Sequence, residues 1–209
     1  SEALQEKKIA ELAEQIASKK DVKMVLIAGP SSSSKTTFAK KLGLQLRIKG
    51  LKPVTIGTDD YFVERSLTPR DENGEYDFET IDALDLDLFN DHLTRLINGE
   101  TVNIPTFDFK EGTKRYDDNK KLHLNDDEIL VIEGIHCLND KLTSKIPKEN
   151  KFKIYISDLT VLNIDNFNRI STTDTRLVRR IVRDYNFRGY SAKETLDRWP
   201  SVNRGERRN

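Results

Sequence analysis

Cysteine and histidine are scarce in this sequence, and their scarcity narrows the chemistry open to the chain. The 209 residues include a single cysteine, Cys137, which cannot form a disulfide within the chain. We therefore expect a buried thiol and a reducing compartment. The three histidines (His92, His123 and His136) lack the spacing of metal ligands.

Long apolar runs and an excess of charge of one sign are also missing. No apolar run approaches the roughly 20 residues of a membrane-spanning helix, and the N-terminus lacks the charged-then-apolar pattern of a signal peptide. The 35 Lys and Arg residues balance the 35 Asp and Glu residues, so no long-range attraction to nucleic acid or an anionic membrane is expected. We expect a soluble protein of the cytoplasm with neither partner.

Strands and helices are predicted to alternate along most of the chain. Short apolar runs at 22–28, 53–57, 129–132 and 152–156 have the length and branching of buried strands. Apolar residues at helical spacing indicate helices over 4–17, 35–47 and 84–97, with two more at 174–185 and 192–199. This alternation implies an α/β fold, a parallel sheet with helices on both faces.

The length allows one well-buried domain with a small attachment. We expect a single domain over 1–209, with a leading helix at 1–20, a hairpin insertion at about 100–125 and Arg-rich lid helices at about 174–200. The chain opens inside an amphipathic pattern without an initiator Met and closes on a polar stretch. We therefore expect a domain excised from a longer protein, with further domains covalently linked to it; homo-oligomerisation is left open.

The segment GPSSSSKT at 29–36 matches the phosphate-loop pattern G-x-x-x-x-G-K-[ST] except at Ser34, where the pattern has glycine. A strand is predicted before it and a helix after it, so its backbone N–H groups would face the phosphates of ATP at a helix N-terminus. Lys35 would reach the β- and γ-phosphates and Thr36 would place its hydroxyl on Mg²⁺. A side chain at Ser34 is expected to narrow the loop or resist an angle that glycine adopts freely. The expected nucleotide-binding residues are Gly29, Ser31, Ser32, Ser33, Ser34, Lys35, Thr36 and Thr37.

Two other predicted strands end in carboxylates. The strand at 129–132 runs into Glu133, and the strand at 53–57 runs toward Asp59 and Asp60. A carboxylate at such a strand end can hold Mg²⁺ or its waters beside a nucleotide. A strand ending in Glu-Gly is common by itself, so the prediction for Glu133 depends on the phosphate loop.

Six short motifs follow one another along about residues 24–190. They are Gly29 with Lys35-Thr36-Thr37, Asp59-Asp60-Tyr61-Phe62, Tyr76-Asp77-Phe78-Glu79 with Asp82-Ala83, Ile104-Pro105-Thr106-Phe107-Asp108-Phe109, Glu133-Gly134-Ile135, and the arginine-rich segment 175–184. In this order they resemble the uridine kinase and phosphoribulokinase family. The resemblance implies a P-loop NTPase-type fold and an ATP- and Mg²⁺-dependent kinase, with a uridine- or cytidine-like nucleoside as the leading acceptor.

The resemblance also implies roles for single residues. Asp59 matches the catalytic aspartate that accepts the proton of the acceptor hydroxyl and helps to order Mg²⁺; a helix cap is the alternative. Glu79 matches a residue that binds sugar hydroxyls, and Phe78 an aromatic that packs on the base, although a core phenylalanine is equally expected there. The predicted acceptor-binding set is Asp59, Tyr61, Phe78, Glu79, Phe107 and Arg176.

Four arginines, Arg176, Arg179, Arg180 and Arg183, share one face of a predicted helix, where a kinase lid supplies cations to the transferring phosphate. A solvated basic face is the alternative. The neighbouring apolar residues Leu177, Val178, Ile181 and Val182 are expected to turn toward the core. By resemblance Arg176 would also reach the sugar, and Arg188 would belong to the lid.

Two positions depart from the uridine-cytidine kinases. Phe107 stands where these enzymes have a tyrosine, and Gly112 stands where they have a histidine that reads the base edge. A site with fewer hydrogen bonds to the base discriminates less strongly against analogues of the acceptor. We therefore predict a broader or altered choice of acceptor.

Three other functions stay open at this point. A kinase of the same fold could act on another small hydroxyl compound, of the pantothenate or ribulose phosphate type. Ser34 leaves room for a catalytically weak ATP-binding module that regulates a larger protein. A switch GTPase fits poorly, because Asp71-Glu72-Asn73-Gly74 matches D-x-x-G without a preceding strand and no N-K-x-D segment follows.

Overall fold

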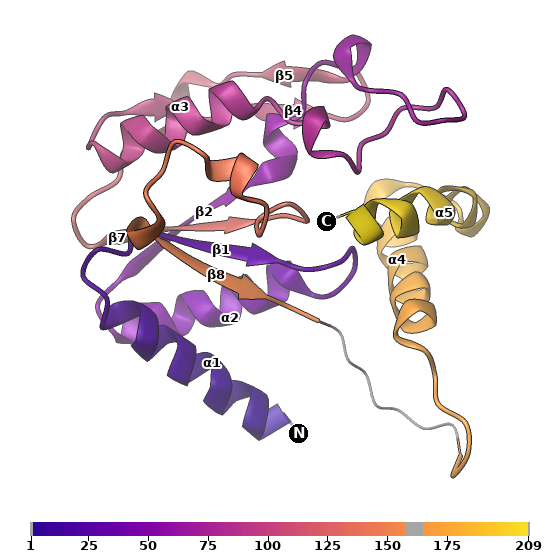
Figure 1. Cartoon of the computed structure of the whole chain (residues 1–209), viewed down its shortest axis with the longest axis horizontal. Helices are drawn as coiled ribbons and strands as arrows, with labels where there is room; N and C mark the ends of the chain where they lie inside the picture. Colours follow the sequence, from indigo (N-terminus) through magenta and orange to yellow (C-terminus); the bar gives the residue numbers. More distant parts are fainter. Residues whose placement is uncertain (1, 158–164, 209) are drawn as a thin grey trace.

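Four parallel strands form the central sheet of the computed structural model, which describes residues 2–157 and 165–208 (Figure 1). They are β1 (Met24–Ala28), β2 (Lys52–Gly57), β7 (Glu128–Glu133) and β8 (Lys151–Tyr155), in the order β2-β7-β1-β8. Each neighbouring pair is parallel, so the carboxyl ends of all four strands lie at one edge. The predicted α/β fold of the P-loop type is confirmed.

Helices cover both faces of this sheet. Helices α1 (Glu2–Ala17) and α2 (Lys35–Ile48) lie on one face, and α3 (Leu86–Ile97) lies on the other (Figure 1). Side chains alternate along β1: Val25 and Ile27 join the core under α1 and α2, whereas Met24 and Leu26 join the core under α3. A strand buried on both faces has to be apolar throughout, which is why β1 reads as a continuous apolar run.

The segment between α3 and β7 forms two short antiparallel pairs. Strand β3 (Val102–Asn103) pairs with β6 (Lys121–Leu122), and between them β4 (Thr106–Asp108) pairs with β5 (Thr113–Arg115). The outer pair confirms the predicted hairpin, and the inner pair is an addition. The short 3-10 helices are η1 (Thr58–Tyr61), η2 (Arg65–Leu67), η3 (Ile81–Ala83), η4 (Asp118–Lys120), η5 (Asp140–Thr143) and η6 (Lys148–Asn150).

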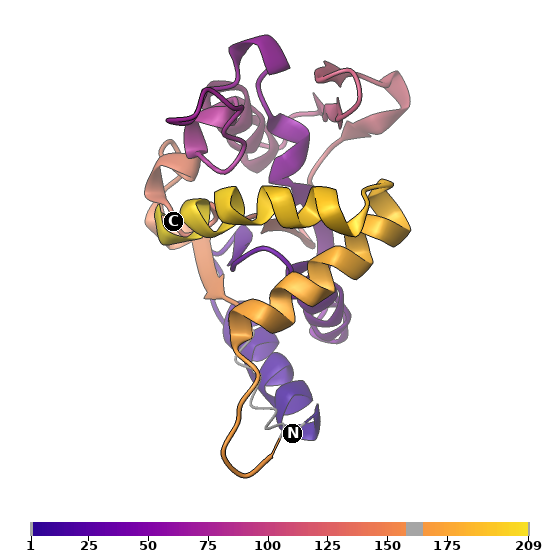
Figure 2. The same cartoon turned by 90° about the vertical axis from the view of Figure 1, so that its right-hand side faces the viewer.

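Two helices at the end of the chain pack together beyond the carboxyl ends of the strands (Figures 1 and 2). Helix α4 (Thr172–Arg188) is followed by α5 (Ala192–Arg208), which crosses it in Figure 2. Helix α5 does not end at residue 199 as predicted, but continues through Pro200. Buried Trp199 and Val202 hold its inner face, and this packing offsets the backbone hydrogen bond that a proline removes.

The prediction that the apolar residues of α4 turn toward the core is wrong for two of the four. Val178 and Val182 are 60% and 54% exposed, whereas Leu177 and Ile181 are half-buried and Arg176 is 6% exposed. Arg176 and Arg180 turn inward because their guanidinium groups find hydrogen-bond acceptors there, which buried cations require.

The buried thiol and the turn at Asp71 are two smaller features of the fold. The Cys137 thiol is buried, and burial raises its pKa above the ordinary range. The Gly74 backbone N–H donates to the Asp71 carbonyl at 2.9 Å and closes a turn over residues 71–74. Among the described helices, none has both the length and the apolar character needed to cross a membrane.

Candidate active site

Three strand ends converge at one edge of the sheet. The loop 29–34 follows β1, Asp59 follows β2, and Glu133 ends β7. The register pairs Glu133 with Ile27 on one side and with Gly57 on the other. Ligands of open α/β sheets bind at this edge, so the topology brings together the phosphate loop and both carboxylates that were predicted from the sequence.

Glycine is required where β7 leaves this edge. A Cβ on Gly134 would lie 2.2 Å from the Thr58 hydroxyl oxygen. The Thr58 hydroxyl donates weakly to the Glu133 carbonyl at 3.4 Å. The missing side chain therefore allows the segment that carries Asp59 to approach Glu133 closely.

The phosphate loop holds two serines in the left-handed conformation. Ser32 has φ 61° and Ser34 has φ 73°, so Ser34 adopts the kind of angle that the loop pattern assigns to glycine. Such a conformation costs a non-glycine residue about 1–2 kcal/mol. At the other end of the loop, a Cβ on Gly29 would lie 2.3 Å from the Ile156 carbonyl oxygen, so only glycine fits there.

Two serine hydroxyls of this loop fit an anion. Within the described part of the chain, the side-chain oxygens of Ser32 and Ser33 are buried and have no hydrogen-bond partner. Buried hydroxyls without partners are costly, and these two lie just before the N-terminus of α2, where a phosphate is favoured. The loop residues present thus fit the triphosphate of a nucleotide.

Lys35 lies at the first turn of α2 and folds back over the loop. Its ammonium group donates to the carbonyls of Gly29 at 2.9 Å and Pro30 at 3.1 Å. Burial lowers the pKa of Lys35 below its ordinary value, and the carboxylates of Glu133 and Asp59 oppose that shift. The amine is therefore a partly desolvated cation facing two carboxylates.

Oxygen ligands suited to Mg²⁺ gather beside Lys35. The Thr36 hydroxyl donates to a Glu133 carboxylate oxygen at 2.6 Å, and Asp59 is exposed at the start of η1. Over residues 2–157 and 165–208, no group of three or more His, Cys, Asp or Glu side chains forms a metal cage. Mg²⁺ is commonly held by one or two carboxylates together with substrate phosphates and water, and the Thr36, Glu133 and Asp59 oxygens fit that pattern. Thr37 follows in the first turn of α2 and is exposed.

Three arginines of α4 bind the phosphate loop directly. Arg176 Nε donates to the Ser31 carbonyl at 3.0 Å, and Arg179 Nε to the Ser32 carbonyl at 3.2 Å. Arg180 Nη1 donates to the Ser31 hydroxyl at 2.7 Å, and Arg179 Nη2 donates to the Ser34 hydroxyl. The arginine face thus lies against the loop that is predicted to bind phosphate.

Asp184 organises the second half of this arginine face. Both Arg183 Nε and Nη2 donate to its Oδ1, at 2.9 and 2.7 Å, and Arg180 lies 3.3 Å from its other oxygen. Asp184 is 3% exposed. No role was predicted for Asp184 from the sequence. The signal was its spacing, four residues after Arg180 and four before Arg188, with which it also pairs at 3.8 Å.

Tyr61 is not part of the site surface, contrary to the prediction. Its side chain is 1% exposed, its hydroxyl lies 3.0 Å from His92 Nδ1, and its ring packs on Phe89. Burial raises its pKa well above the ordinary range. Tyr61 therefore belongs to the core under α3.

Phe78 and Phe107, two other predicted acceptor residues, belong to an aromatic cluster. Phe62 contacts Phe78, Phe107 and Phe109 edge-on, with ring centroids 5.7, 5.6 and 6.1 Å away. Phe107 is buried at 5% exposure, whereas Phe109 is 54% exposed. The cluster therefore has one solvent-facing ring and a buried wall.

Glu79 connects this region with helices α4 and α5. Its carboxylate opposes the burial that lowers the pKa of Arg180. A Cβ on Gly205 of α5 would lie 2.3 Å from the Glu79 Cβ. Glu79 therefore lies against α5 and within electrostatic reach of α4.

Gly112 leaves the hairpin without a side chain beside Arg65. It has φ 76°, and a Cβ there would lie 2.6 Å from the Arg65 Cβ. The Arg65 guanidinium donates to the carbonyls of Lys110, at 3.1 Å, and Phe109. A histidine at this position would displace Arg65, so the departure from uridine-cytidine kinases at Gly112 is built into the packing.

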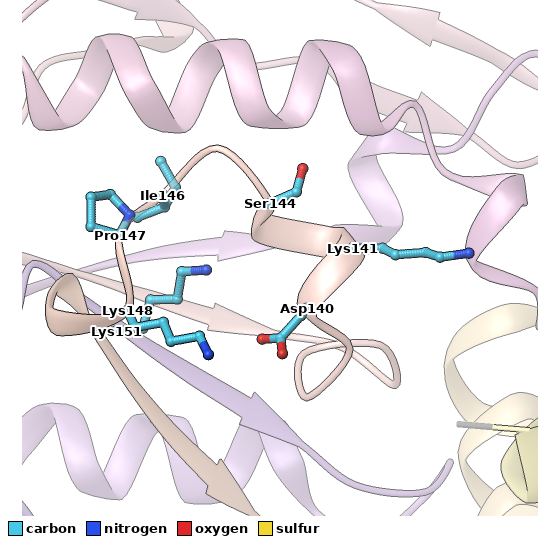
Figure 3. A pocket seen from close by; sticks show the side chains of 7 residues that line it. All are labelled: Asp140, Lys141, Ser144, Ile146, Pro147, Lys148 and Lys151. Atoms are coloured by element: carbon cyan, nitrogen blue, oxygen red, sulfur yellow. The ribbon is translucent and has the colours of Figure 1, made fainter.

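A separate surface cavity of about 470 Å³ lies at the amino end of β8, away from the phosphate loop (Figure 3). Three lysines line it, and Figure 3 shows Lys141 pointing away from Lys148 and Lys151. Lys151 Nζ already donates to the Thr143 carbonyl at 2.6 Å. We assign this cavity no part in the site.

Comparisons with known proteins agree with this geometry. The sequence model of the "Phosphoribulokinase / Uridine kinase family" matches residues 24–205. The uridine kinase of Ureaplasma parvum serovar 3 is 26% identical over 179 residues, which cover 86% of this chain and 77% of that protein.

Two solved structures share the fold. One, described as a fructose transport system kinase from Silicibacter sp. TM1040, has a TM-score of 0.63 at 16% identity and covers 95% of this chain and 93% of its own. Another, described as a possible uridine kinase from Bacillus stearothermophilus, has a TM-score of 0.57 at 23% identity, with 85% and 93% covered. The chain belongs to the phosphoribulokinase and uridine kinase family and is an ATP-dependent kinase.

Proposed function

We propose that this kinase transfers the γ-phosphoryl group of ATP to the 5′-hydroxyl of a uridine- or cytidine-like nucleoside and releases the nucleoside monophosphate. The main observation in support is that Lys35, the hydrogen-bonded pair Thr36 and Glu133, and Asp59 meet at one edge of the sheet. The arginines of α4 lie over the same edge. The relative from Ureaplasma parvum, named a uridine kinase, matches most of the chain and supports a nucleoside as acceptor.

The loop and Lys35 bind the nucleotide. Phosphate oxygens accept hydrogen bonds from the loop amides and from the Ser32 and Ser33 hydroxyls, which have no partner in the protein. Lys35 leaves its carbonyl partners and binds the β- and γ-phosphates instead. Thr36, Glu133 and Asp59 would hold Mg²⁺, which when bound neutralises charge on the phosphates.

Asp59 and the lid arginines act on the transfer. Asp59 is exposed at the carboxyl end of β2, where it accepts the proton as the acceptor oxygen bonds to the γ-phosphorus and the bond to ADP breaks. Arg176, Arg179 and Arg180 already lie against the loop and stabilise the charge on the transferring group.

Glu79 and Phe78 are placed for the sugar and the base. Glu79 lies between the aromatic cluster and α5, so its carboxylate accepts hydrogen bonds from sugar hydroxyls. Phe78 is only partly buried at the edge of the core, which leaves a ring surface for a base.

One observation favours a wider acceptor range. Neither Phe107 nor Gly112 has a side chain that could hydrogen-bond to a base. Arg65 fills the space that a side chain at position 112 would need. A pocket that reads the base by apolar contact discriminates weakly. Other small hydroxyl compounds, of the pantothenate or ribulose phosphate type, therefore belong in the test.

The test is phosphoryl transfer from γ-labelled ATP to a panel of uridine, cytidine, purine nucleosides, pantothenate and ribulose 5-phosphate. We expect label in a nucleoside 5′-monophosphate, and none with 5′-deoxyuridine, which lacks the acceptor hydroxyl. Label only on pantothenate or ribulose 5-phosphate would replace the nucleoside as acceptor. ATP binding without transfer to any compound would indicate a regulatory module.

A further inference from the structure

Ser34 occupies a position where backbone and side chain are both unusual. Its backbone is left-handed at φ 73° and ψ 25°, immediately before α2, and its hydroxyl makes no capping bond to that helix. A serine normally caps a helix through its side chain. Here the side-chain oxygen accepts a hydrogen bond from Arg179 of α4.

The contacts between α4 and the loop are of two kinds. Arg176 and Arg179 donate to the carbonyls of Ser31 and Ser32, and any residue at those two positions would supply the same acceptors. The bonds from Arg179 to the Ser34 hydroxyl and from Arg180 to the Ser31 hydroxyl need a side-chain oxygen. A glycine at position 34 would keep the loop shape and lose one of these two anchors.

We propose that Ser34 is a positioning residue for Arg179, with its hydroxyl fixing the guanidinium of Arg179 over the phosphate loop. Arg179 then donates to the phosphate loop at two points, the Ser32 carbonyl and the Ser34 hydroxyl. The second bond to the loop narrows the directions that a planar guanidinium can take. The left-handed backbone of Ser34 makes the second anchor available, so the shape of the loop sets the position of the lid.

This inference deepens the proposed function, because an arginine held in place before the reaction stabilises transferred charge without reorganising. Its structural part does not depend on that function. The contact between α4 and the loop exists without turnover, so it is measured separately from catalysis.

The experiment compares Ser34→Ala, Ser34→Gly, Arg179→Ala and the double variant Ser34→Ala with Arg179→Ala in the full chain. Ser34→Ala removes the hydroxyl and keeps the Cβ, whereas Ser34→Gly removes both and relaxes the backbone. Hydrogen exchange of the amides of α4 reports the lid in nucleotide-free protein. Thermal melting confirms that each variant is folded, and Ser34→Gly serves if Ser34→Ala does not fold.

We expect both Ser34 variants to reduce protection of α4 by about threefold to tenfold, since each loses a bond to a charged donor. In the Arg179→Ala background, Ser34→Ala should cause no further loss. In turnover, we expect Ser34→Ala to lower kcat by about threefold to tenfold while the acceptor KM stays unchanged.

Wild-type protection of α4 in both Ser34 variants would overturn the inference. So would losses that multiply in the double variant, because the two side chains would then act independently. Reduced protection in Ser34→Ala with no turnover in any variant, wild type included, would leave the anchor in place and instead reject the proposed function.

Discussion

At the scale of single residues, two carboxylates beside the phosphate loop stand in different surroundings. Glu133 is half-buried and accepts a hydrogen bond from Thr36 at 2.6 Å, whereas Asp59 is exposed at the end of β2. A carboxylate already bonded to the loop suits a supporting role toward Mg²⁺ and its ligands. An exposed one can reach a hydroxyl of a bound acceptor.

Replacing Asp59 with Asn tests this division. We expect kcat to fall by about 10²- to 10⁴-fold, because the acceptor hydroxyl loses its base. Nucleotide binding depends mainly on the loop and Lys35, so the KM for ATP should change little. Steady-state kinetics measure both.

Asp60→Asn is the matched control. Asp60 Oδ1 accepts a hydrogen bond from the Phe107 backbone N–H at 3.3 Å, and an amide oxygen can still accept it. Turnover should therefore remain close to that of the unaltered chain. Equal losses in Asp59→Asn and Asp60→Asn would argue against a specific role for Asp59.

Lys35 predicts a pH dependence. Burial lowers its pKa below the ordinary 10.5, so the charge that binds phosphate is lost at lower pH than for an exposed lysine. ATP affinity should weaken with a midpoint below 10.5, whereas the same titration of Lys35→Met should lack this fall. Isothermal titration from pH 7.5 upward measures it.

The same lowered pKa changes stability in the opposite direction: ATP affinity falls as pH rises, whereas the free energy of unfolding increases. Between the lowered folded pKa and 10.5 the unfolded chain binds more protons than the folded chain, so Lys35 adds to the free energy of unfolding as pH rises through that interval. A weakening of ATP binding that also appears in Lys35→Met would assign the pH dependence to another group.

At the scale of elements, α4 shows which interactions decide the orientation of an amphipathic helix. Its periodicity defines an arginine face and an apolar face, but periodicity does not say which face meets the protein. Carbonyls and hydroxyls of the loop at residues 31–34 accept hydrogen bonds from the arginines. These acceptors lie far from α4 in the sequence, so the orientation could not be predicted from the helix alone.

Val178→Ser and Arg176→Ala test this orientation. Val178 is 60% exposed, so Val178→Ser should change the free energy of unfolding by no more than about 0.5 kcal/mol. Arg176 is 6% exposed, donates to Ser31 and lies 5.5 Å over the Trp199 ring, so Arg176→Ala should destabilise by about 1–3 kcal/mol. Urea denaturation measures both free energies of unfolding. A larger loss of stability in Val178→Ser than in Arg176→Ala would contradict this orientation.

A substitution in α5 is expected to change the KM for the acceptor. A Cβ on Gly205 would lie 2.3 Å from the Glu79 Cβ, so Gly205→Ala should displace Glu79 and raise the acceptor KM by roughly tenfold. The KM for ATP should not follow. Asn203→Ala in the same helix is the control, and an equal rise in acceptor KM there would show that any change in α5 suffices.

At the scale of the whole molecule, the sequence predicted what depends on local pattern. Apolar runs predicted all four sheet strands, and the phosphate-loop pattern with two acidic strand ends predicted the edge where Lys35, Asp59 and Glu133 meet. Parallel strands place their carboxyl ends together, so chain order was enough to assemble this part of the site.

What the sequence did not predict depends on contacts between distant segments. Tyr61 stands in a motif with site residues, but the turn η1 directs it to His92 and the core. The pair β4 and β5 has three residues per strand and no apolar alternation, too little for a period to appear. Helix α5 passes Pro200 because Trp199 and Val202 are buried against other elements.

Calorimetric titration of Mg·ATP into the folded chain tests the central claim most directly, namely that the serine-rich loop binds a triphosphate although Ser34 replaces a glycine. We predict one binding site per chain, lost or strongly weakened in Lys35→Ala. Absence of Mg·ATP binding by folded wild-type protein, or unchanged binding in Lys35→Ala, would contradict the account.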